Sequence, residues 1–217
     1  MLSALPLSAA LPLFLLLPLT SAQQARCQYY PLRNFADLFI EAQTFGELDP
    51  SFLFSPNYTF LQNGKPTTPA ASTLSTPLPI DLEITLIDQA NCAVYTELII
   101  ADAKSPRVIG AQIQFAAEES DAGGVALQAT RVEIVKASAS VPVPGISTNW
   151  QFNASAALGH VRGEDWEAIA QTERTAREGL VGAAEAFLEW VGEGRAVDGV
   201  PFGVPCSRLE GEWRGGS

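Results

Sequence analysis

The sequence predicts an α+β fold in which a curved antiparallel sheet wraps around one helix and is followed by another. Two segments with apolar residues at helical spacing flank the middle of the chain. Between them lie four segments in which apolar and polar residues alternate, as they do in strands. Because a sheet that curves around a helix encloses a cone-shaped space, we expect an apolar cavity between the two layers.

The first helix is predicted from Asn34 to Phe45, because its apolar residues form one stripe. The stripe consists of Phe35, Leu38, Phe39 and Ala42. Gly46 can end this helix in the left-handed conformation. A strand is expected from Phe52 to Asn63, and the stretch Lys65 to Pro79, rich in Thr, Ser, Pro and Ala, predicts a surface loop.

Four strands are predicted in the middle of the chain. The segment Ile80 to Leu86 alternates strictly, so its apolar residues share one buried face. These residues are Ile80, Leu82, Ile84 and Leu86. The other three strands are expected at Cys92–Ile100, Arg107–Phe115 and Val125–Val135. The acidic segment Glu118 to Gly124 is the predicted tip of a hairpin.

After the strands the pattern becomes helical again. A short fifth strand, Trp150 to Ala156, is expected beyond a loop from Ser138 to Thr148, and a helix is expected from Glu164 onward. The apolar stripe of this helix is Leu180, Ala184, Phe187, Leu188 and Val191. Gly179 and Gly182 indicate a kink or a close contact between helix and sheet.

The order of the last elements repeats the order of the first. A helix, a Gly-containing turn and a short apolar strand between Val200 and Gly211 follow one another, as they do at the start of the domain. We therefore divide the chain into an α+β domain over residues 23–178 and a segment over residues 179–217. This second segment is expected to begin an incomplete second copy of the first unit.

Residues 1–22 are predicted to be a signal peptide that directs the protein out of the cell. They carry no charged side chain, contain the apolar run Leu11 to Leu19, and end in the small residues Thr20, Ser21 and Ala22. A transmembrane helix is the competing interpretation, but the run is too short and three prolines interrupt it.

The formal net charge of −11 disfavours two classes of partner. Nucleic acids and anionic membranes are bound by basic patches that neutralise phosphates, and the sequence contains no such patch. An acidic surface also keeps a secreted protein soluble. We expect neither a nucleic acid nor a membrane as partner.

Cysteines and glycosylation motifs also suit the secretory pathway. With three cysteines, one thiol is free, pairs between chains or has lost its partner. We expect a bridge between Cys27 and Cys92, which would tie the N-terminus to the sheet, because Cys206 lies in the incomplete unit. The sequons at Asn57 and Asn153 are candidate glycan sites.

Four residues are candidates for chemistry, although no catalytic signature is present. His160, the one histidine, is expected in a loop and is a candidate general base. Asp88, Tyr95 and Glu97 form a better cluster, since Tyr95 and Glu97 share one side of a strand. In a dry pocket the pKa of Glu97 would rise, but on the solvent side the pair would be ordinary, with Val94, Leu98 and Ile100 facing the core. Neither a metal nor a cofactor is predicted, because ligand spacing and phosphate-binding loops are missing.

Several segments together resemble the secreted fungal proteins grouped as domain of unknown function 8021. They are Cys27, Phe39–Gly46, Asp88–Glu97, Val108–Gly110, Trp150–Ala154, Trp166 through Arg174 and Arg177, and Pro205–Gly211. The matches run in order from about residue 27 to the end, and Pro-Cys-x-Arg-Leu-Glu-Gly is the most specific. The resemblance implies a fungal origin and a cone-shaped fold of the SnoaL and NTF2 type, many members of which bind or transform small hydrophobic molecules.

The chain departs from that family in two ways. It ends at Ser217, whereas the family generally continues with a second sheet, and it has a Pro-rich stretch around Val141 to Gly145. A premature stop, a misplaced gene end or completion by a second chain would each account for the first departure.

The expected function is therefore binding of a small hydrophobic metabolite by a secreted, non-catalytic protein. One alternative is a cyclase, isomerase or dehydratase of secondary metabolism that uses Glu97, Asp88 or His160 as acid or base. Another is a secreted interaction or effector protein that completes its sheet from another chain. A homodimer through Cys206 or through the incomplete second unit belongs to that alternative.

Overall fold

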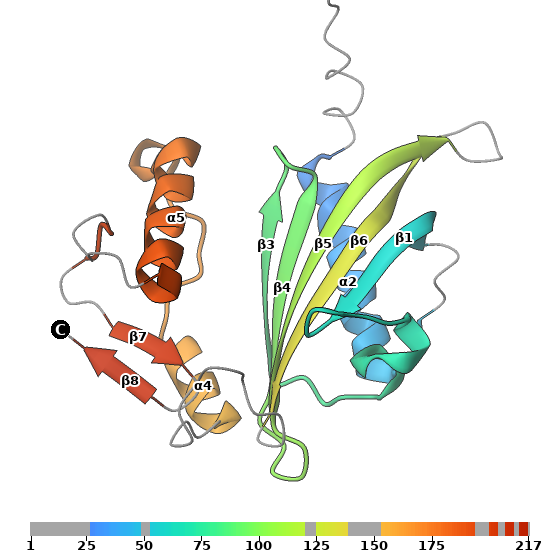
Figure 1. Ribbon diagram of the computed structural model, residues 1–217, viewed down its shortest axis with the longest axis horizontal. Helices are drawn as coiled ribbons and strands as arrows, with labels where there is room; N and C mark the ends of the chain where they lie inside the picture. The colour runs from blue at the N-terminus through green and yellow to red at the C-terminus, as the bar shows by residue number, and fades with distance from the viewer. Residues whose placement is uncertain are drawn as a thin grey trace, which may run out of the picture.

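The computed structural model describes residues 27–48, 53–119, 125–138, 153–193, 200–203, 207–210 and 213–216 (Figure 1). Within these ranges the chain forms a six-stranded sheet, three helices and a separate two-stranded sheet. The six-stranded sheet curves and does not close, with α2 (Tyr29–Phe45) packed on one of its faces. The predicted α+β class is thus confirmed.

Four neighbouring strands form an antiparallel meander. They are β3 (Leu82–Asp88), β4 (Ala93–Ile100), β5 (Arg107–Glu119) and β6 (Val125–Ser138). Each pairs with the next in the chain, so that the sheet order is β2-β1-β6-β5-β4-β3. The predicted strands therefore lie close to their expected positions, and β5 and β6 form the expected hairpin, although residues 120–124 at its tip lie outside the described ranges.

The expectation of a wholly antiparallel sheet is wrong for one pair. Strand β1 (Phe54–Gln62) lies parallel to β6, because the chain crosses to the far edge of the sheet before it returns through the meander. Asn63 and Gly64, with φ of 51° and 73°, then turn the chain into the short β2 (Lys65–Pro66). The Asn63 side chain accepts from Lys136 N–H at 2.7 Å, which fastens this turn to β6.

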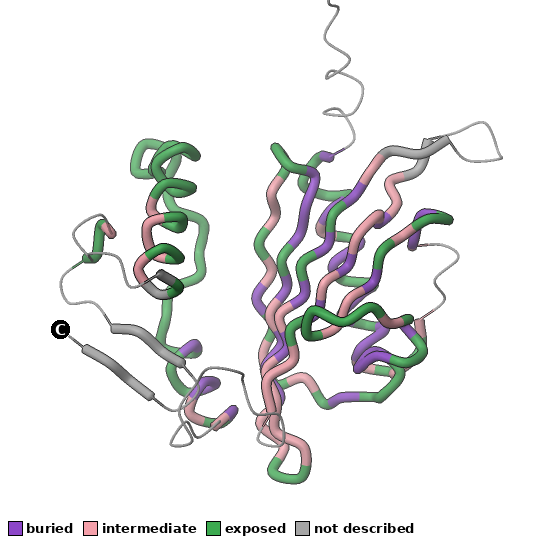
Figure 2. Tube along the Cα trace, viewed as in Figure 1, coloured by how far each residue is buried: buried purple, intermediate pink, exposed green. Residues whose placement is uncertain are grey.

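The main core lies between α2 and the sheet. α2 begins at Tyr29, five residues before the predicted start, and Gly46 ends it in the left-handed conformation with φ of 71°. Phe39 is completely buried, and the rings of Phe35 and Phe115 lie 4.5 Å apart. Figure 2 shows the burial concentrated on α2 and on the middle of the sheet. A cone-shaped cavity was expected between α2 and the sheet. Buried side chains from both layers occupy this space instead.

The opposite side of the sheet, called the back face below, is covered by a described helix at one end. There α4 (Ala154–Val161) packs Leu158 and Val161 on Ile84 and Ile99. The predicted strand Trp150–Ala156 is wrong for its last residues, because Asn153 caps this helix and Ala154 begins it; residues 150–152 lie outside the described ranges.

The apolar residues of β3 share one face, but that face does not contact α2. Register places Leu82, Ile84 and Leu86 on one side, as expected, but that side is the back face rather than the α2 face. As a result Leu86 is 51% exposed. Ile80 does not share this side, because it precedes the strand and packs against the main core.

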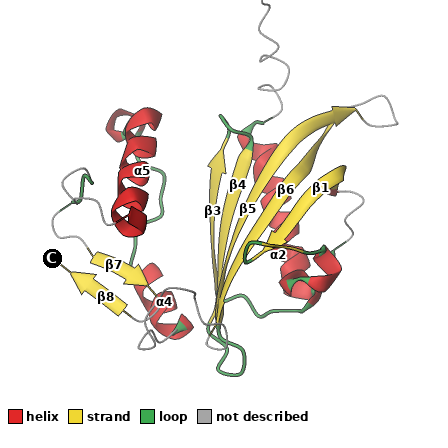
Figure 3. Ribbon diagram, viewed as in Figure 1, coloured by secondary structure: helices red, strands yellow, loops and turns green. Residues whose placement is uncertain are grey.

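The C-terminal part lies beside β3 (Figure 3). Its helix α5 (Arg177–Glu193) begins well after the predicted Glu164, because the chain first forms a short 3-10 turn at Gln171–Glu173. No residue of α5 whose burial is described is buried. A side chain at Gly182 would meet open space, so the expected close contact between helix and sheet is absent there.

Beyond α5, two short strands pair with each other. The short strand expected between Val200 and Gly211 is present at Ser207–Glu210 (β7), and it pairs antiparallel with a strand that was not predicted, Trp213–Gly216 (β8). The Trp190 ring contacts Phe187 and Phe202, each at 5.7 Å. Within the described residues no helix has the length and apolar character needed to cross a membrane.

Candidate functional site

The hairpin between β3 and β4 joins three parts of the molecule. Cys92, in the left-handed conformation with φ of 50°, forms the predicted disulfide with Cys27, and both cysteines are buried. The bridge ties the start of α2 to the sheet, and a disulfide fits an oxidising compartment. Cys206 lies outside the described residues.

Asp88 organises the same hairpin. Its carboxylate accepts hydrogen bonds from the N–H groups of Ala90 and Asn91 and from the Asn91 side chain. Arg177 at the start of α5 adds two more, at 2.9 and 2.6 Å. Partial burial acts to raise the pKa of Asp88, but Arg177 and Asn91 outweigh it and hold the pKa below its ordinary value of 3.8. The geometry makes Asp88 an anchor for the hairpin and for α5.

Tyr95 and Glu97 share one side of β4, as predicted, and that side is the back face. The core side holds Val94, Leu98 and Ile100, which agrees with the solvent-side interpretation. The Tyr95 hydroxyl donates to Glu97 at 3.1 Å. Burial, and then the Glu97 carboxylate, raise the pKa of Tyr95 to about 12. Tyr95 therefore stays protonated and positions the carboxylate rather than acting as a base.

Gly110 makes this placement of the tyrosine ring possible. A Cβ atom at Gly110 would lie 2.8 Å from the Tyr95 hydroxyl oxygen. The ring thus lies directly over the β5 backbone, where any side chain would displace it.

The three candidate catalytic residues do not form one site. Asp88 pairs with Ala93, and Glu97 lies four residues further along β4, a separation of about 13 Å along the strand. His160 lies in the last turn of α4, not in the expected loop, and is exposed. Among the described residues, no hydrogen bond or ion pair joins it to either carboxylate, and no three His, Cys, Asp or Glu side chains gather closely enough to hold a metal ion.

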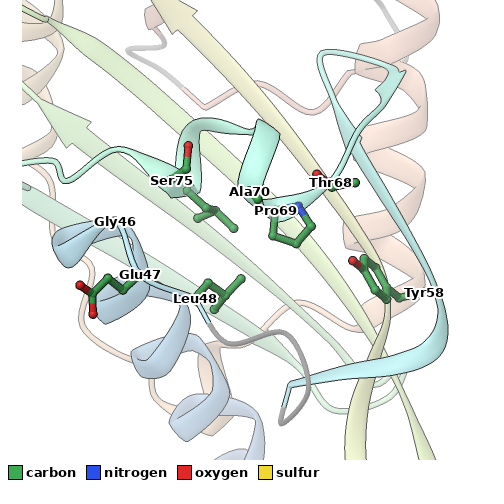
Figure 4. Close-up of a pocket in the computed structure, with 9 residues that line it drawn as sticks. Gly46, Glu47, Leu48, Tyr58, Thr68, Pro69, Ala70 and Ser75 are labelled. Atoms are coloured by element: carbon green, nitrogen blue, oxygen red, sulfur yellow. The ribbon is translucent and has the colours of Figure 1, made fainter.

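One hollow in the described structure is a groove at the C-terminal end of α2. It has a volume of about 840 Å³ and is lined by α2's end, β1 and two 3-10 turns, Pro69–Ala71 and Thr73–Ser75. Figure 4 shows Leu48, Pro69 and Tyr58 around the same open space, while the Glu47 carboxylate points away from Pro69 and Tyr58. Below we call this the α2–β1 groove.

A buried glutamine fixes the wall of the α2–β1 groove. The Gln43 side-chain amide donates to the backbone carbonyls of Thr73 and Thr76, each at 3.0 Å. The backbone carbonyl of Gln43 in turn accepts from Leu78 N–H. From β1, the Gln62 side chain accepts from Thr73 N–H at 2.8 Å. These bonds pin the turns between α2 and β1, so the groove is formed before any ligand arrives.

Sequence reasoning missed this groove, because it interpreted Lys65 to Pro79 only as a surface loop. One signal was present. Gln43 follows Ala36 and Phe39 at the spacing of the buried stripe of α2, and a polar residue at a core position implies a buried hydrogen-bond partner.

A second hollow of about 440 Å³ adjoins the first. Both are lined by Glu47 and Leu48, and the second adds residues from the outer side of α2 and from the chain before β1. These are Leu38, Glu41, Ala42, Phe45 and Leu53. The two hollows are thus apolar, and the charged residues that line them are the two carboxylates Glu41 and Glu47.

Comparison with other proteins gives no further guidance. No known protein family matches the chain, no curated protein is similar to it, and no solved structure matches its fold.

Proposed function

We propose that this chain is a secreted protein that binds a small hydrophobic molecule in the α2–β1 groove. The observation that supports the proposal is the groove itself. Its volume of about 840 Å³ lies in the range of ligand pockets, about 300–1,000 Å³. Its lining combines Leu48, Pro69 and Leu74 with a few polar groups, among them the Tyr58 phenol.

Rigidity of the wall favours binding. Because Gln43 and Gln62 already hold the 3-10 turns, a ligand does not have to order them, and less binding free energy is lost on association. An apolar ligand is bound by removing its surface and the surface of Leu48 and Tyr58 from water.

The charge around the groove narrows the class of ligand. Glu41 and Glu47 line the adjoining hollows, and among the described residues no Lys, Arg or His does. A neutral or cationic head group is therefore preferred over an anionic one, since a carboxylate beside Glu47 would be repelled.

The enzymatic alternative has less support. Asp88 is saturated with hydrogen bonds, Glu97 lies on the back face, and His160 is exposed on α4. None of the three lines either hollow.

Titration with Nile red, a neutral lipophilic dye, tests the proposal. The Ala70 side chain lines the groove and is exposed, so Ala70→Arg places a long cation in it without disturbing the core. Ala71, the next residue, is equally exposed but does not line the groove, so Ala71→Arg is the matched control. We expect saturable binding by the wild type and the control, and an affinity at least about tenfold lower for Ala70→Arg, or about 1.4 kcal/mol.

Competition by a long-chain alkylamine and by the carboxylic acid of equal length tests the head-group preference. The amine should displace the dye at lower concentration, and Glu47→Gln should reduce the difference. Non-saturable fluorescence, or equal affinity of the two Arg variants, would show that the groove is not the binding site.

A further inference from the structure

The two glycosylation sequons lie in very different structural settings. In β1 the ladder with β6 is interrupted, since Phe54 pairs with Ala129 and Thr59 already pairs with Arg131. The residues between them bulge out of the sheet. Asn57 lies in this bulge; it is exposed, and its side-chain amide makes no hydrogen bond to the described residues. Such an amide is accessible to a modifying enzyme and leaves room for a bulky group.

Asn57 lies outside the α2–β1 groove. The rings of Phe54, Tyr58 and Phe60 lie together, at 4.8 and 6.2 Å, and Tyr58 lines the groove. Thr59 pairs regularly with Arg131, and neighbouring residues of a strand point to opposite sides, so the Thr59 side chain is on the side of the back face. Asn57, in the bulge two residues before it, is exposed and lines neither hollow.

Asn153 is less suited to carry a glycan. Its side-chain oxygen accepts from Ala156 N–H at 3.0 Å and caps α4, and the residue is half-buried. Ala154, the next residue, is only 1% exposed. An oligosaccharide here would have to fit at the junction of α4 and the sheet.

We propose that Asn57, and not Asn153, carries an N-linked oligosaccharide that covers the β1 edge. The proposal rests on the secretion part of the proposed function and is independent of the groove. The donor is an oligosaccharide on a polyprenyl diphosphate. A bond forms between Asn57 Nδ2 and the anomeric sugar carbon, the bond from that carbon to the diphosphate oxygen breaks, and the amide loses one proton.

The physical role of the glycan follows from its place. Only Leu61 and Gln62 of β1 pair with β2, so within the described residues the backbone of β1 around Asn57 lies at the edge of the sheet. Unpaired backbone groups at such an edge can pair with another chain, and a bulky hydrophilic group prevents this. The oligosaccharide would thus protect the edge of the sheet around Asn57.

The test is intact-mass and glycopeptide mass spectrometry of the full chain, secreted from a eukaryotic host. If the chain's own leader does not export it, a heterologous leader is placed before residue 1. We expect one glycan, at Asn57, in the wild type and in Asn153→Gln. We expect none in Asn57→Gln or in Thr59→Ala, which keeps the asparagine but removes the sequon hydroxyl.

A glycan at Asn153, or a secreted wild type without any glycan, overturns the proposal. Nile red binding by the same samples separates this result from the proposed function. Since Asn57 lines neither hollow, Asn57→Gln should bind the dye as the glycosylated protein does, and a changed affinity would contradict the proposed position of the glycan. A wild type that carries the glycan but does not bind the dye would contradict only the groove.

Discussion

The two long helices, α2 and α5, are both 17 residues long and both carry an apolar stripe, yet their environments are opposite. α2 buries seven residues against the sheet. In α5 Leu180 and Leu188 remain 59% and 67% exposed, and the helix contacts the sheet through the ion pair of Arg177 with Asp88. An apolar stripe therefore predicts that a segment is helical and which of its sides is apolar. Whether that side is buried depends on which other elements of the chain pack against it.

The difference between the helices has a direct energetic consequence. A stripe that packs contributes to global stability through buried area, whereas an exposed stripe adds little beyond the helix's own marginal stability. In the first two pairs of substitutions below, one member tests α2 and the other tests α5; the third pair tests the contact between α5 and the sheet.

The largest difference is expected for two matched phenylalanines. Phe39→Ala should lower the free energy of unfolding by about 3–5 kcal/mol, because Phe39 is completely buried and its removal leaves a cavity. Phe187→Ala should cost about 1 kcal/mol, since Phe187 is only half-buried. Urea unfolding followed by circular dichroism measures both.

Tryptophan fluorescence sharpens this test. All four tryptophans lie at residue 150 or later, outside α2 and the six-stranded sheet. If α5 is only loosely coupled to the sheet, fluorescence should report a transition at lower urea than circular dichroism. Coincident transitions, together with equal losses for the two variants, would mean that both helices belong to one cooperative unit.

A smaller and opposite pair of effects is expected at two glycines. Gly46 has φ of 71°, and a Cβ there would lie 2.5 Å from the Pro77 ring, so Gly46→Ala should destabilise the protein by about 2–3 kcal/mol. A Cβ at Gly182 meets nothing, so Gly182→Ala should stabilise α5 by about 1 kcal/mol through helix propensity. Thermal unfolding shows whether each substitution lowers or raises the melting temperature. A higher melting temperature for Gly46→Ala would refute the described end of α2.

The smallest effect is expected for the ion pair that links α5 to the hairpin. Because the pKa of Asp88 is lowered in the folded protein, its carboxylate stabilises the fold above about pH 4, and the contribution is lost as the pH falls through the folded pKa. Arg177→Ala should raise the pKa of Asp88 toward 3.8 and reduce this acid-induced loss.

NMR titration of the Asp88 side-chain carboxyl checks the ion-pair prediction. Arg174→Ala is the control, since Arg174 bonds the Ile169 carbonyl instead. A pKa of Asp88 that Arg177→Ala leaves unchanged would show that the ion pair does not persist in solution.

Local pattern was sufficient for the α+β class and the meander, since alternation along β3, β4 and β5 depends on neighbours in the chain. The Cys27–Cys92 bridge, which joins residues 65 apart, was predicted instead by assigning Cys206 to the incomplete unit. Local pattern failed where the partner is distant. The parallel pairing of β1 with β6 follows from a crossover, and α5 begins at Arg177 although acidic residues such as Glu164 resemble a helix start.

The candidate site was harder to predict than the fold. Tyr95 and Glu97 were placed together because they lie on one strand, but the face they occupy depends on where α2 and α4 pack. The α2–β1 groove is built by Gln43 from contacts across 30 residues or more, which no local pattern encodes.

The parallel pairing of β1 with β6 also sets an order of events during synthesis. Ribosomes release the N-terminal end first, so β1 is complete long before β6 emerges, and it has no long strand to pair with in the interval. Cys92 precedes β6, so the disulfide with Cys27 can hold α2 against the β3–β4 hairpin while the chain is still growing. The arrival of β6 then inserts a strand between two existing parts, and the first strand made is the last to be joined to the sheet.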